Sequence, residues 1–357
     1  GGGGAADVKE SIEAVSTEMF GSKTTDMGFF GILAADEVML ADRAALTRRG
    51  VEPRFTRPMV LGDLVRDWAI TPAEAALFPY DDQRLVPLED APGFAVWMWP
   101  CRTVLGNRAT FAKLTYFQEG RPWWEWHQIA LRRAIGPTIT FAFVATHNHF
   151  VLDRSGKVFK QSAPVIKLPA GSSEDEHLGL LGLLNSSVAC FWLKQVSFNK
   201  GDSTDSMGAR TTGDSAFDTY EFASTKVAEF PLSPDRPLSI ARQLDTLAQQ
   251  LARVQPAALL ASNLTAGSAY PESAGGQFES QSPAATPSLP SRASLDAART
   301  QAEQLRGLMI TWQEELDWEC YGLYSCLRLS DKRYSPFLSA NPPAIALGQR
   351  AFEIVLA

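Results

Sequence analysis

The chain has 357 residues, enough for about two domains, and its 45% hydrophobic to 20% charged composition is that of a globular protein. A net charge of −7 argues against a protein that coats nucleic acid with its whole surface. No signal peptide and no apolar run near the roughly 18 residues of a spanning helix is recognised, so we expect a cytoplasmic protein without a membrane contact. Four unpaired cysteines are expected to be free thiols: Cys101, Cys190, Cys320 and Cys326.

Residues 1–95 are expected to form a connecting region. The pattern predicts a helix over 8–20, short strands at 29–33 and 38–40, and a turn into a helix over 62–68. The four glycines at the start are interpreted as a linker or as the cut edge of a longer chain.

Aromatic and basic residues alternate between 96 and 138. Flat rings among Arg and Lys suit a nucleic-acid surface, although Trp and Phe fill protein cores more often, so the basic side chains are the better candidates. From Arg102 to Lys167 there are ten Lys or Arg against three acids, a local charge of +7. An acidic protein can therefore carry a positive face here.

Residues 139–201 are expected to form a hairpin sheet followed by one apolar helix. Alternating β-branched and aromatic residues predict strands at 139–143, 150–151, 158–159 and 165–166, with a turn at 153–156. Apolar residues at three- and four-residue steps predict a helix over 178–192. The polar loop at 198–217 is long enough to be functional, and strands at 220–222 and 227–231 are expected to return to the sheet.

The last third of the chain has a helical period. Stripes of apolar residues predict helices over 240–254 and 294–316, which could form an antiparallel pair. A disordered linker rich in Pro, Ser and Gly is expected over 255–293. The region 294–357 is expected to be helical and to end in a strand-like run, truncated from a longer protein.

Two motifs suggest chemistry and neither is complete. His147 and His149 would share one face of a strand and could hold a metal, contact DNA or be structural, but no further ligand cluster is present, so no metal is expected. The run from Asn341 to Ala344 resembles the Asn-Pro-Pro-aromatic loop of amino-methyltransferases without its aromatic residue. No phosphate loop, nucleophile elbow or cofactor-binding Gly-rich turn is found, so we expect no catalytic residue in this chain.

Several ordered segments carry a resemblance. ATHNHF (145–150), SAPVI (162–166), LLNS (183–186) and YEF (220–222) resemble the target recognition domains of large adenine-specific DNA methyltransferases of the type IIG restriction class. VRDW (65–68), FPYD (78–81) and QEELDW (313–318) are similar to the PglX-type methyltransferases of BREX phage-defence systems. The resemblance implies an S-adenosylmethionine-dependent adenine-N6 methyltransferase whose catalytic domain precedes this region and is missing here.

The expected fold is α+β, a mixed-sheet recognition domain over 96–237 followed by long helices. The resemblance implies double-stranded DNA as the partner, with cations on phosphates and polar loops on base edges. No family motif fixes the contacts, which we predict from the pattern: Arg132, Arg133, His147, Asn148, His149, Arg154, Lys157, Lys160, Asn199, Lys200 and Arg210. The alternative is an interaction module that docks another phage-defence protein through the C-terminal helices.

Overall fold

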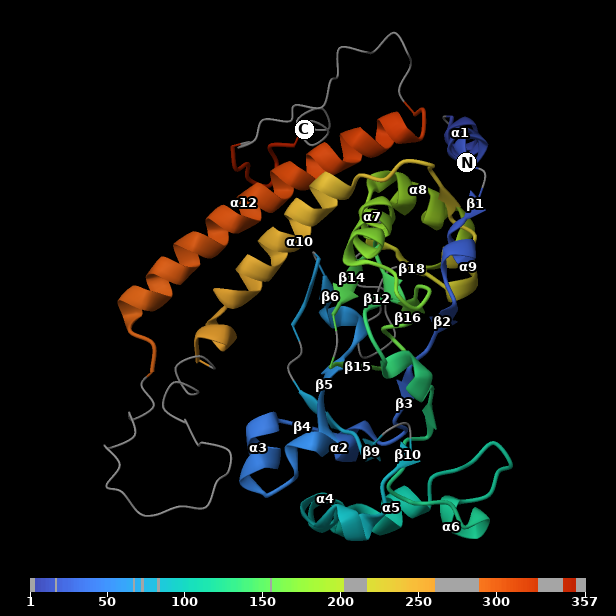
Figure 1. The fold of residues 1–357 in the computed structure, drawn as a ribbon, viewed down its shortest axis with the longest axis vertical. Coiled ribbons are helices and arrows are strands. Elements are labelled where there is room, and N and C mark those ends of the chain that lie inside the picture. Colours follow the sequence, from blue (N-terminus) through green and yellow to red (C-terminus); the bar gives the residue numbers. More distant parts are fainter. Residues whose placement is uncertain are drawn as a thin grey trace. The chain divides into compact units, whose positions relative to one another are not determined.

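The computed structural model describes residues 4–16, 18–66, 68–71, 74–81, 84–154, 156–201, 217–260, 289–326 and 343–350. The chain divides into two compact units. The first comprises Gly1–Leu238 together with Cys320–Asp331, and the second comprises Ser239–Glu319 together with Lys332–Ala357. Helices and several mixed sheets confirm the predicted α+β class (Figure 1).

The first unit contains a four-stranded antiparallel sheet in the order β14-β12-β16-β2. Its strands are β2 (Asp26–Gly28), β12 (Thr138–Phe141), β14 (Phe150–Asp153) and β16 (Val165–Lys167). All residues of β12 and β14 are buried, so both faces of these two strands are covered. Pairing of Thr138 with Asp153 and of Lys167 with Asp26 brings these polar residues to one end of the sheet.

A second sheet joins strands that lie far apart in the sequence. Its order is β15-β5-β8-β4, with β15 parallel to β5 and the other pairs antiparallel, and its strands are β4 (Leu40–Ala41), β5 (Thr56–Val60), β8 (Ala75–Leu77) and β15 (Val158–Phe159). Phe30 lies 6.0 Å, centroid to centroid, from the rings of both Trp126 and Phe159 in one buried cluster. The early strands thus share a core with residues of the recognition region, and the boundary at residue 95 stays a prediction.

The remaining strands are short. A three-stranded sheet has the order β13-β18-β17, from β13 (Val144–Ala145), β17 (Phe198–Gly201) and β18 (Thr219–Glu221). Two-stranded pairs are formed by β1 (Glu18–Met19) with β19 (Pro231–Leu232), β3 (Gly31–Ile32) with β11 (Gln128–Ile129), β6 (Val65–Arg66) with β7 (Ala69–Ile70), and β9 (Tyr80–Asp81) with β10 (Arg84–Leu85).

Short helices connect these strands. The α-helices are α1 (Ala5–Val15), α2 (Asp36–Met39), α3 (Arg43–Arg48), α4 (Pro92–Met98), α5 (Arg102–Gly106), α6 (Tyr116–Glu119) and α9 (Ser224–Ala228). The 3-10 turns are η1 (Phe20–Lys23), η2 (Pro53–Phe55), η3 (Gly62–Leu64), η4 (Leu88–Asp90), η5 (Trp99–Cys101) and η6 (Leu131–Ala134).

The predicted apolar helix is in fact two helices, α7 (Glu174–Leu184) and α8 (Ser187–Val196). Ser173 and Glu176 form a capping box at the start of α7. Ser186 interrupts the helix because it takes an extended conformation and its hydroxyl accepts from the Ala189 amide, 3.2 Å away, as an N-cap. Apolar spacing alone did not reveal this break, since it continues across the junction.

Three other predictions from the pattern are wrong in part or in full, and a fourth, the strand at 38–40, is wrong because Val38 and Met39 belong to α2. The predicted helix at 62–68 is the 3-10 turn η3 followed by the strand β6, and the helix predicted over 8–20 ends at Val15. The predicted strand at 227–231 is the end of α9 and the start of β19. In each place tertiary pairing decides the conformation of a short segment with weak local preference.

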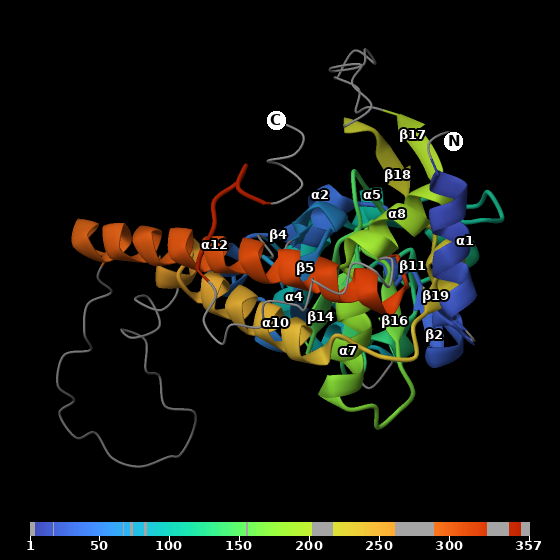
Figure 2. The same cartoon turned by 90° about the horizontal axis from the view of Figure 1, so that it is seen from above.

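The second unit contains two long helices, α10 (Leu238–Arg253) and most of α12 (Arg292–Leu323). They run side by side in opposite directions in both views (Figures 1 and 2). The apolar stripes of both helices are buried, from Ile240 to Ala248 and from Ala298 to Leu316. Most of the predicted linker and the strand-like run at 351–357 lie outside the described residues.

Candidate nucleic-acid interface

Five cations gather at one end of the sheet β14-β12-β16-β2. We call this surface the charged end, and it consists of Asp26, Arg132, Arg133, Asp153, Arg154, Lys157 and Lys167. The strand register creates it, because Asp26 ends up beside Lys167 and Asp153 beside Thr138. With Glu174 of α7 included, five cations face three carboxylates, which leaves a positive surface.

Arg132 and Arg133 converge on a single carboxylate, that of Asp26. The N···O distances are 2.8 Å from Arg132 and 2.6 Å from Arg133. The hydrogen bond from Arg133, followed by the smaller contribution of Arg132, lowers the pKa of Asp26 to about 2. Arg133 also donates to the carbonyls of Phe29 and Met27, so it fixes β2, whereas the side chain of Arg132 is 68% exposed.

Lys167 belongs to the charged end and was missing from the predicted contacts. Its ammonium donates to the carbonyls of Gly136 and Pro137 and to the Thr138 hydroxyl, at 3.1, 2.9 and 2.5 Å. Burial lowers the pKa of Lys167 to about 8. In the sequence, the one signal for Lys167 as a member of this site is that it is one of the ten cations between residues 102 and 167. A lysine at a strand end has no distinctive spacing.

Arg154 and Lys157 lie on the turn after β14. Lys157 pairs with the buried carboxylate of Asp153, and Arg154 pairs with Glu174 at 2.7 Å. The bond from Arg154 lowers the pKa of Glu174. The sequence predicted this turn as a DNA contact, and the structure places its two cations at the same end of the sheet as Arg132 and Arg133, beside the opposite outer strand.

The His-Asn-His motif (147–149) lies at the opposite end of the sheet. We call this part of the sheet the closed end, and it consists of Asn148, His149, Phe150 and Asn185. Asn148 is buried and its Nδ2 donates to the Leu184 carbonyl at 2.5 Å. Asn185 accepts from the Phe150 amide at 2.9 Å and donates to its carbonyl at 2.8 Å. The ATHNHF and LLNS segments therefore join β14 to the α7–α8 junction.

The two histidines of this motif differ in exposure. Their ring centroids are 4.3 Å apart, with His149 buried and His147 exposed. Burial, followed by the charges of His147 and Arg66, lowers the pKa of His149 to about 3. Within the residues that the structure describes, no cluster of three or more His, Cys, Asp or Glu side chains could hold a metal.

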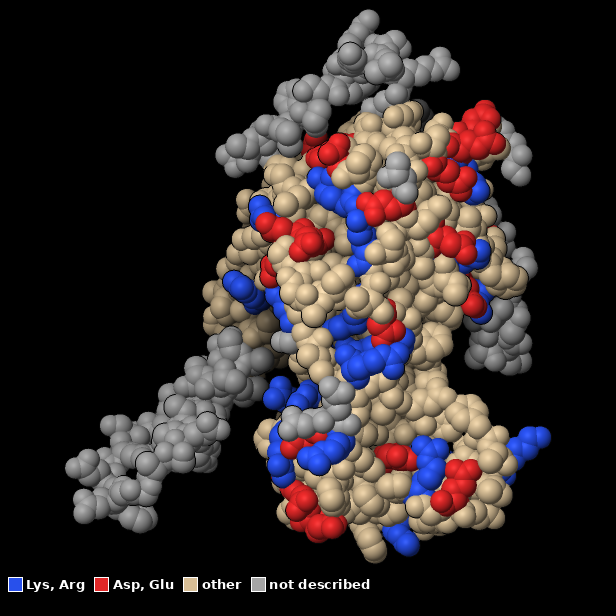
Figure 3. Space-filling model, turned by 45° about the vertical axis from the view of Figure 1, so that its right-hand side comes forward, with Lys and Arg blue, Asp and Glu red and all other residues tan. Residues whose placement is uncertain are grey.

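The other predicted contacts are dispersed. Lys160 pairs with Asp36. Asn199 and Lys200 lie on β17, where Asn199 donates to Asp218 at 2.9 Å and Lys200 pairs with Glu221 at 2.8 Å. Arg210 lies outside the described residues. Figure 3 shows Lys and Arg interspersed with Asp and Glu over one face of the protein.

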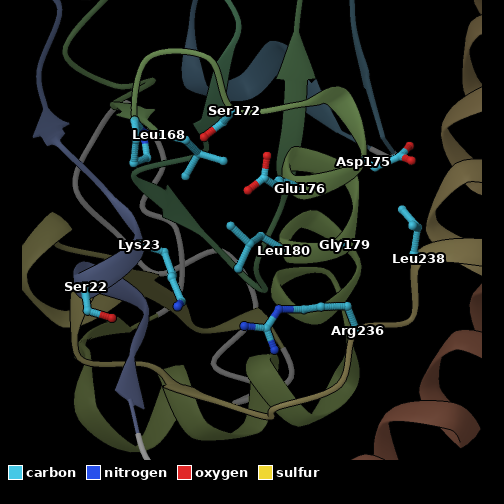
Figure 4. Close-up of a pocket in the computed structure, with 11 residues that line it drawn as sticks. Ser22, Lys23, Leu168, Ser172, Asp175, Glu176, Gly179, Leu180, Arg236 and Leu238 are labelled. Carbon is cyan, nitrogen blue, oxygen red and sulfur yellow. The ribbon is translucent and has the colours of Figure 1, made fainter.

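A cavity of about 410 Å³ lies beside the N-terminal half of α7. Lys23 and Arg236 extend into the same space, with Asp175 and Glu176 of α7 also on its wall (Figure 4). Lys23 already pairs with Glu18 at 2.7 Å, and Glu176 accepts from the Ser173 amide at 2.7 Å. Groups of both signs line this cavity, so its chemistry does not select an anion.

Across the part of the chain that the structure describes, no helix has the length and apolarity needed to span a membrane.

No family model matches the chain. It is 45% identical, over 99% of its length, to the adenine-specific methyltransferase PglX of Streptomyces coelicolor, and it spans 27% of that protein. Two solved structures are similar at a TM-score of 0.41. One is the type IIL restriction-modification enzyme MmeI in complex with DNA (12% identity, 87% of this chain, 37% of that chain), and the other is the type IIG restriction endonuclease BpuSI (10%, 88% and 34%).

Proposed function

We infer that this chain is the DNA-recognition part of an S-adenosylmethionine-dependent adenine-N6 DNA methyltransferase of a BREX phage-defence system. The observation that carries this proposal is the 45% identity to PglX along 99% of the chain. Because the chain spans 27% of PglX, the methyl transfer itself is assigned to the part of such a protein that has no counterpart here.

The described residues do not fit S-adenosylmethionine. Nucleoside cofactors are commonly held where a parallel strand leads through a Gly-rich turn into a helix. β16 leads into α7, but it is antiparallel to both of its neighbours, β12 and β2. Within the described ranges we find no Gly-rich turn between a parallel strand and a helix, so we derive no chemical step through this cofactor.

The charged end is the part of the proposed interface that grips the DNA backbone. Arg132 donates its Nε to Asp26, and no described residue accepts from its terminal N–H groups. A guanidinium has five donors, so it can keep this bond and still contact a phosphate. Arg154 and Lys157 would contact phosphates from the turn after β14, while Arg133 holds β2 in place.

Base reading is assigned to the remaining predicted contacts. Asn199 and Lys200 lie on β17, the edge strand of its sheet, and an edge strand can present polar side chains to a groove. Lys160, His147 and Arg210 stay predictions of the same kind. Asn148 and His149 are buried in the closed end, so in this proposal they position β14 and do not touch DNA.

Fluorescence anisotropy with labelled duplexes across a salt series tests the proposal. We expect the logarithm of the affinity to fall linearly with the logarithm of the salt concentration, by about 0.9 per phosphate contacted. Random-sequence duplexes and duplexes with the methylation site of the host genome separate non-specific from specific binding. If no duplex binds even at low salt, DNA recognition by this chain is wrong and docking to another defence protein is favoured.

A further inference from the structure

The exposed apolar side chains of the first unit are concentrated in one short stretch. Six of them lie between residues 96 and 117: Val96, Trp99, Val104, Phe111, Leu114 and Phe117. Phe111 is 77% exposed and Trp99 is 61% exposed, which is unusual for large rings in a folded protein. These residues lie on α4, η5, α5, α6 and the loop before α6, which we call the aromatic lobe (Figure 1). A concentration of exposed large apolar side chains in one short segment favours a binding site.

The aromatic lobe is held firmly in place. Arg108 is buried and donates to four backbone carbonyls, those of Leu33, Leu105, Trp123 and Glu125, at 2.8 to 3.0 Å. These bonds tie the lobe to the core of the first unit. The exposed rings are therefore presented on a preformed surface, which lowers the entropic cost of binding.

The loop that carries Phe111 is also closed by hydrogen bonds. The Thr110 amide donates to the Leu114 carbonyl at 2.8 Å, and the Lys113 amide donates to the Thr110 carbonyl at 3.0 Å. Lys113 has φ +63°, a left-handed conformation that tightens the turn. Phe111, Lys113 and Leu114 all point outward from this turn as exposed residues.

The aromatic lobe carries more positive than negative charge, and its one carboxylate, Glu119 at the end of α6, accepts a hydrogen bond from the Thr110 hydroxyl. No Asp or Glu occurs from residue 92 to residue 118, while Arg102 and Lys113 are exposed cations. The Arg102 guanidinium lies 5.5 Å from the Trp99 ring centroid and 5.0 Å from the Phe117 ring centroid. The surface thus combines flat rings and two exposed cations with a single carboxylate, which is complementary to a polyanion that carries aromatic rings.

We propose that the aromatic lobe binds a nucleic-acid strand whose bases are unstacked. In a closed duplex the faces of the bases are covered by their neighbours, and only their edges are accessible in the grooves. Rings such as Trp99 and Phe111 can stack only on bases whose faces are free, as they are in single strands, bulges or opened base pairs. This inference rests on the proposed DNA recognition and deepens it. The charged end would bind the paired duplex, and the aromatic lobe would bind DNA whose bases are unstacked.

The test uses the whole chain and three labelled ligands: a single strand, a paired duplex of the same sequence, and that duplex with an internal bulge. Trp99→Ala is expected to weaken binding of the single strand and the bulged duplex by about tenfold, because loss of one stacked base has an effect of this order. The paired duplex should change by less than about twofold on the same grounds. Phe111→Ser is the second variant, since this ring is the more exposed of the two.

Two further variants separate stacking from charge and from exposure. Arg102→Lys keeps the charge and removes the planar group, so it should weaken binding of the single strand while leaving the paired duplex unchanged. Met19→Ala removes another exposed apolar side chain, 52% exposed and outside the lobe, and should alter neither affinity. Far-ultraviolet circular dichroism melts confirm that each variant is folded.

The outcomes are distinguishable. The proposal is overturned if the wild-type chain does not bind the single strand, or if Trp99→Ala and Phe111→Ser both leave that binding unchanged, even when the paired duplex binds well. Equal losses for all three ligands would also overturn it, because they would show a general role of the lobe. If the single strand binds through Trp99 and the paired duplex does not bind, the lobe's role is supported and the proposed duplex recognition is wrong.

Discussion

The two ends of the sheet β14-β12-β16-β2 are built from the same strands and have opposite properties. At the charged end, cations from one strand (β16) and two turns lie with the carboxylates of Asp26 and Asp153. At the closed end, Asn148 and Asn185 bind the backbone of the α7–α8 junction and of β14, and His149 is held neutral by burial. The ends are only about 10 Å apart along a four-residue strand.

We propose that this difference separates DNA-binding groups from supporting groups within one motif-rich region. The side-chain amides of Asn148 and Asn185 are hydrogen-bonded to backbone atoms, so exchanging those bonds for DNA contacts would leave buried groups unpaired. At the charged end the guanidinium of Arg132 is exposed and has donors to spare. Variants at the charged end should therefore change affinity, and variants at the closed end should change stability.

The largest expected effect is on affinity at the charged end. Arg132→Gln combined with Arg154→Gln should lower the slope of the salt dependence by about 2 and weaken duplex binding by about 100-fold at 0.1 M salt. Neither change leaves a buried carboxylate alone, since Asp26 keeps Arg133 and Glu174 is 55% exposed. Anisotropy titrations at several salt concentrations measure both quantities.

The matched control for this double variant is Arg299→Gln. Arg299 lies on α12 with its side chain 81% exposed, and it pairs with Glu303 at 3.0 Å. An exposed pair of this kind contributes little to stability. An equal loss of affinity in Arg299→Gln would mean that net charge, and not the position of the charged end, governs binding.

The next effect is a pH dependence of stability from the closed end. The pKa of His149 is about 3 in the folded chain and near 6.5 when unfolded. Because the unfolded chain binds the proton more tightly, the free energy of unfolding should fall as the pH drops below 6.5, by about 2 kcal/mol at pH 5. Urea unfolding at pH 7.5 and pH 5 measures this loss, which His149→Phe should reduce and His147→Gln should largely retain.

A smaller effect is expected at Asn185. Asn185→Ala removes the bonds to the Phe150 amide and carbonyl and should lower the free energy of unfolding by about 1 to 2 kcal/mol. Asn185→Asp keeps an acceptor for the Phe150 amide and loses the donor to the Phe150 carbonyl. Its free energy of unfolding should therefore lie between those of the wild type and Asn185→Ala, with the added charge as the one further difference. A change in the salt slope of DNA binding in Asn185→Ala would contradict the supporting role of the closed end.

The sequence predicted the elements with strong periodicity and missed what depends on register. The alternation of Ile139, Phe141 and their neighbours identified β12, and the stripes identified α10 and α12. The break at Ser186 was missed because capping by a single serine competes with a continuous apolar spacing. The position of strand β19 was predicted wrongly because its pairing partner, β1, lies more than 200 residues away in the sequence.

The candidate site was only partly accessible to the same reasoning. Turn position brought Arg154 and Lys157 into consideration, since turns expose their side chains, and their contact with DNA stays a prediction. The roles of Asn148 and Lys167 depend on which strand ends meet. Local sequence patterns predict neither the register that sets Lys167 opposite Asp26 nor the hydrogen bond from Asn148 to the Leu184 carbonyl. A polar residue at a strand end has the same local pattern whether it faces solvent or closes a helix junction.

The smallest expected effect is that of Lys167. Raising the pH through the pKa of this lysine should change stability and affinity in opposite directions. Its pKa is about 8 in the folded chain, below the value near 10.4 of an exposed lysine. Between these values the unfolded chain binds the extra proton, so the free energy of unfolding should rise with pH across this window. The charged end loses one positive charge over the same range, so duplex affinity should fall by about threefold between pH 7 and pH 9. Lys167→Arg keeps its charge throughout and should flatten both trends, whereas a fall in affinity that persists in Lys167→Arg would place the titrating group elsewhere.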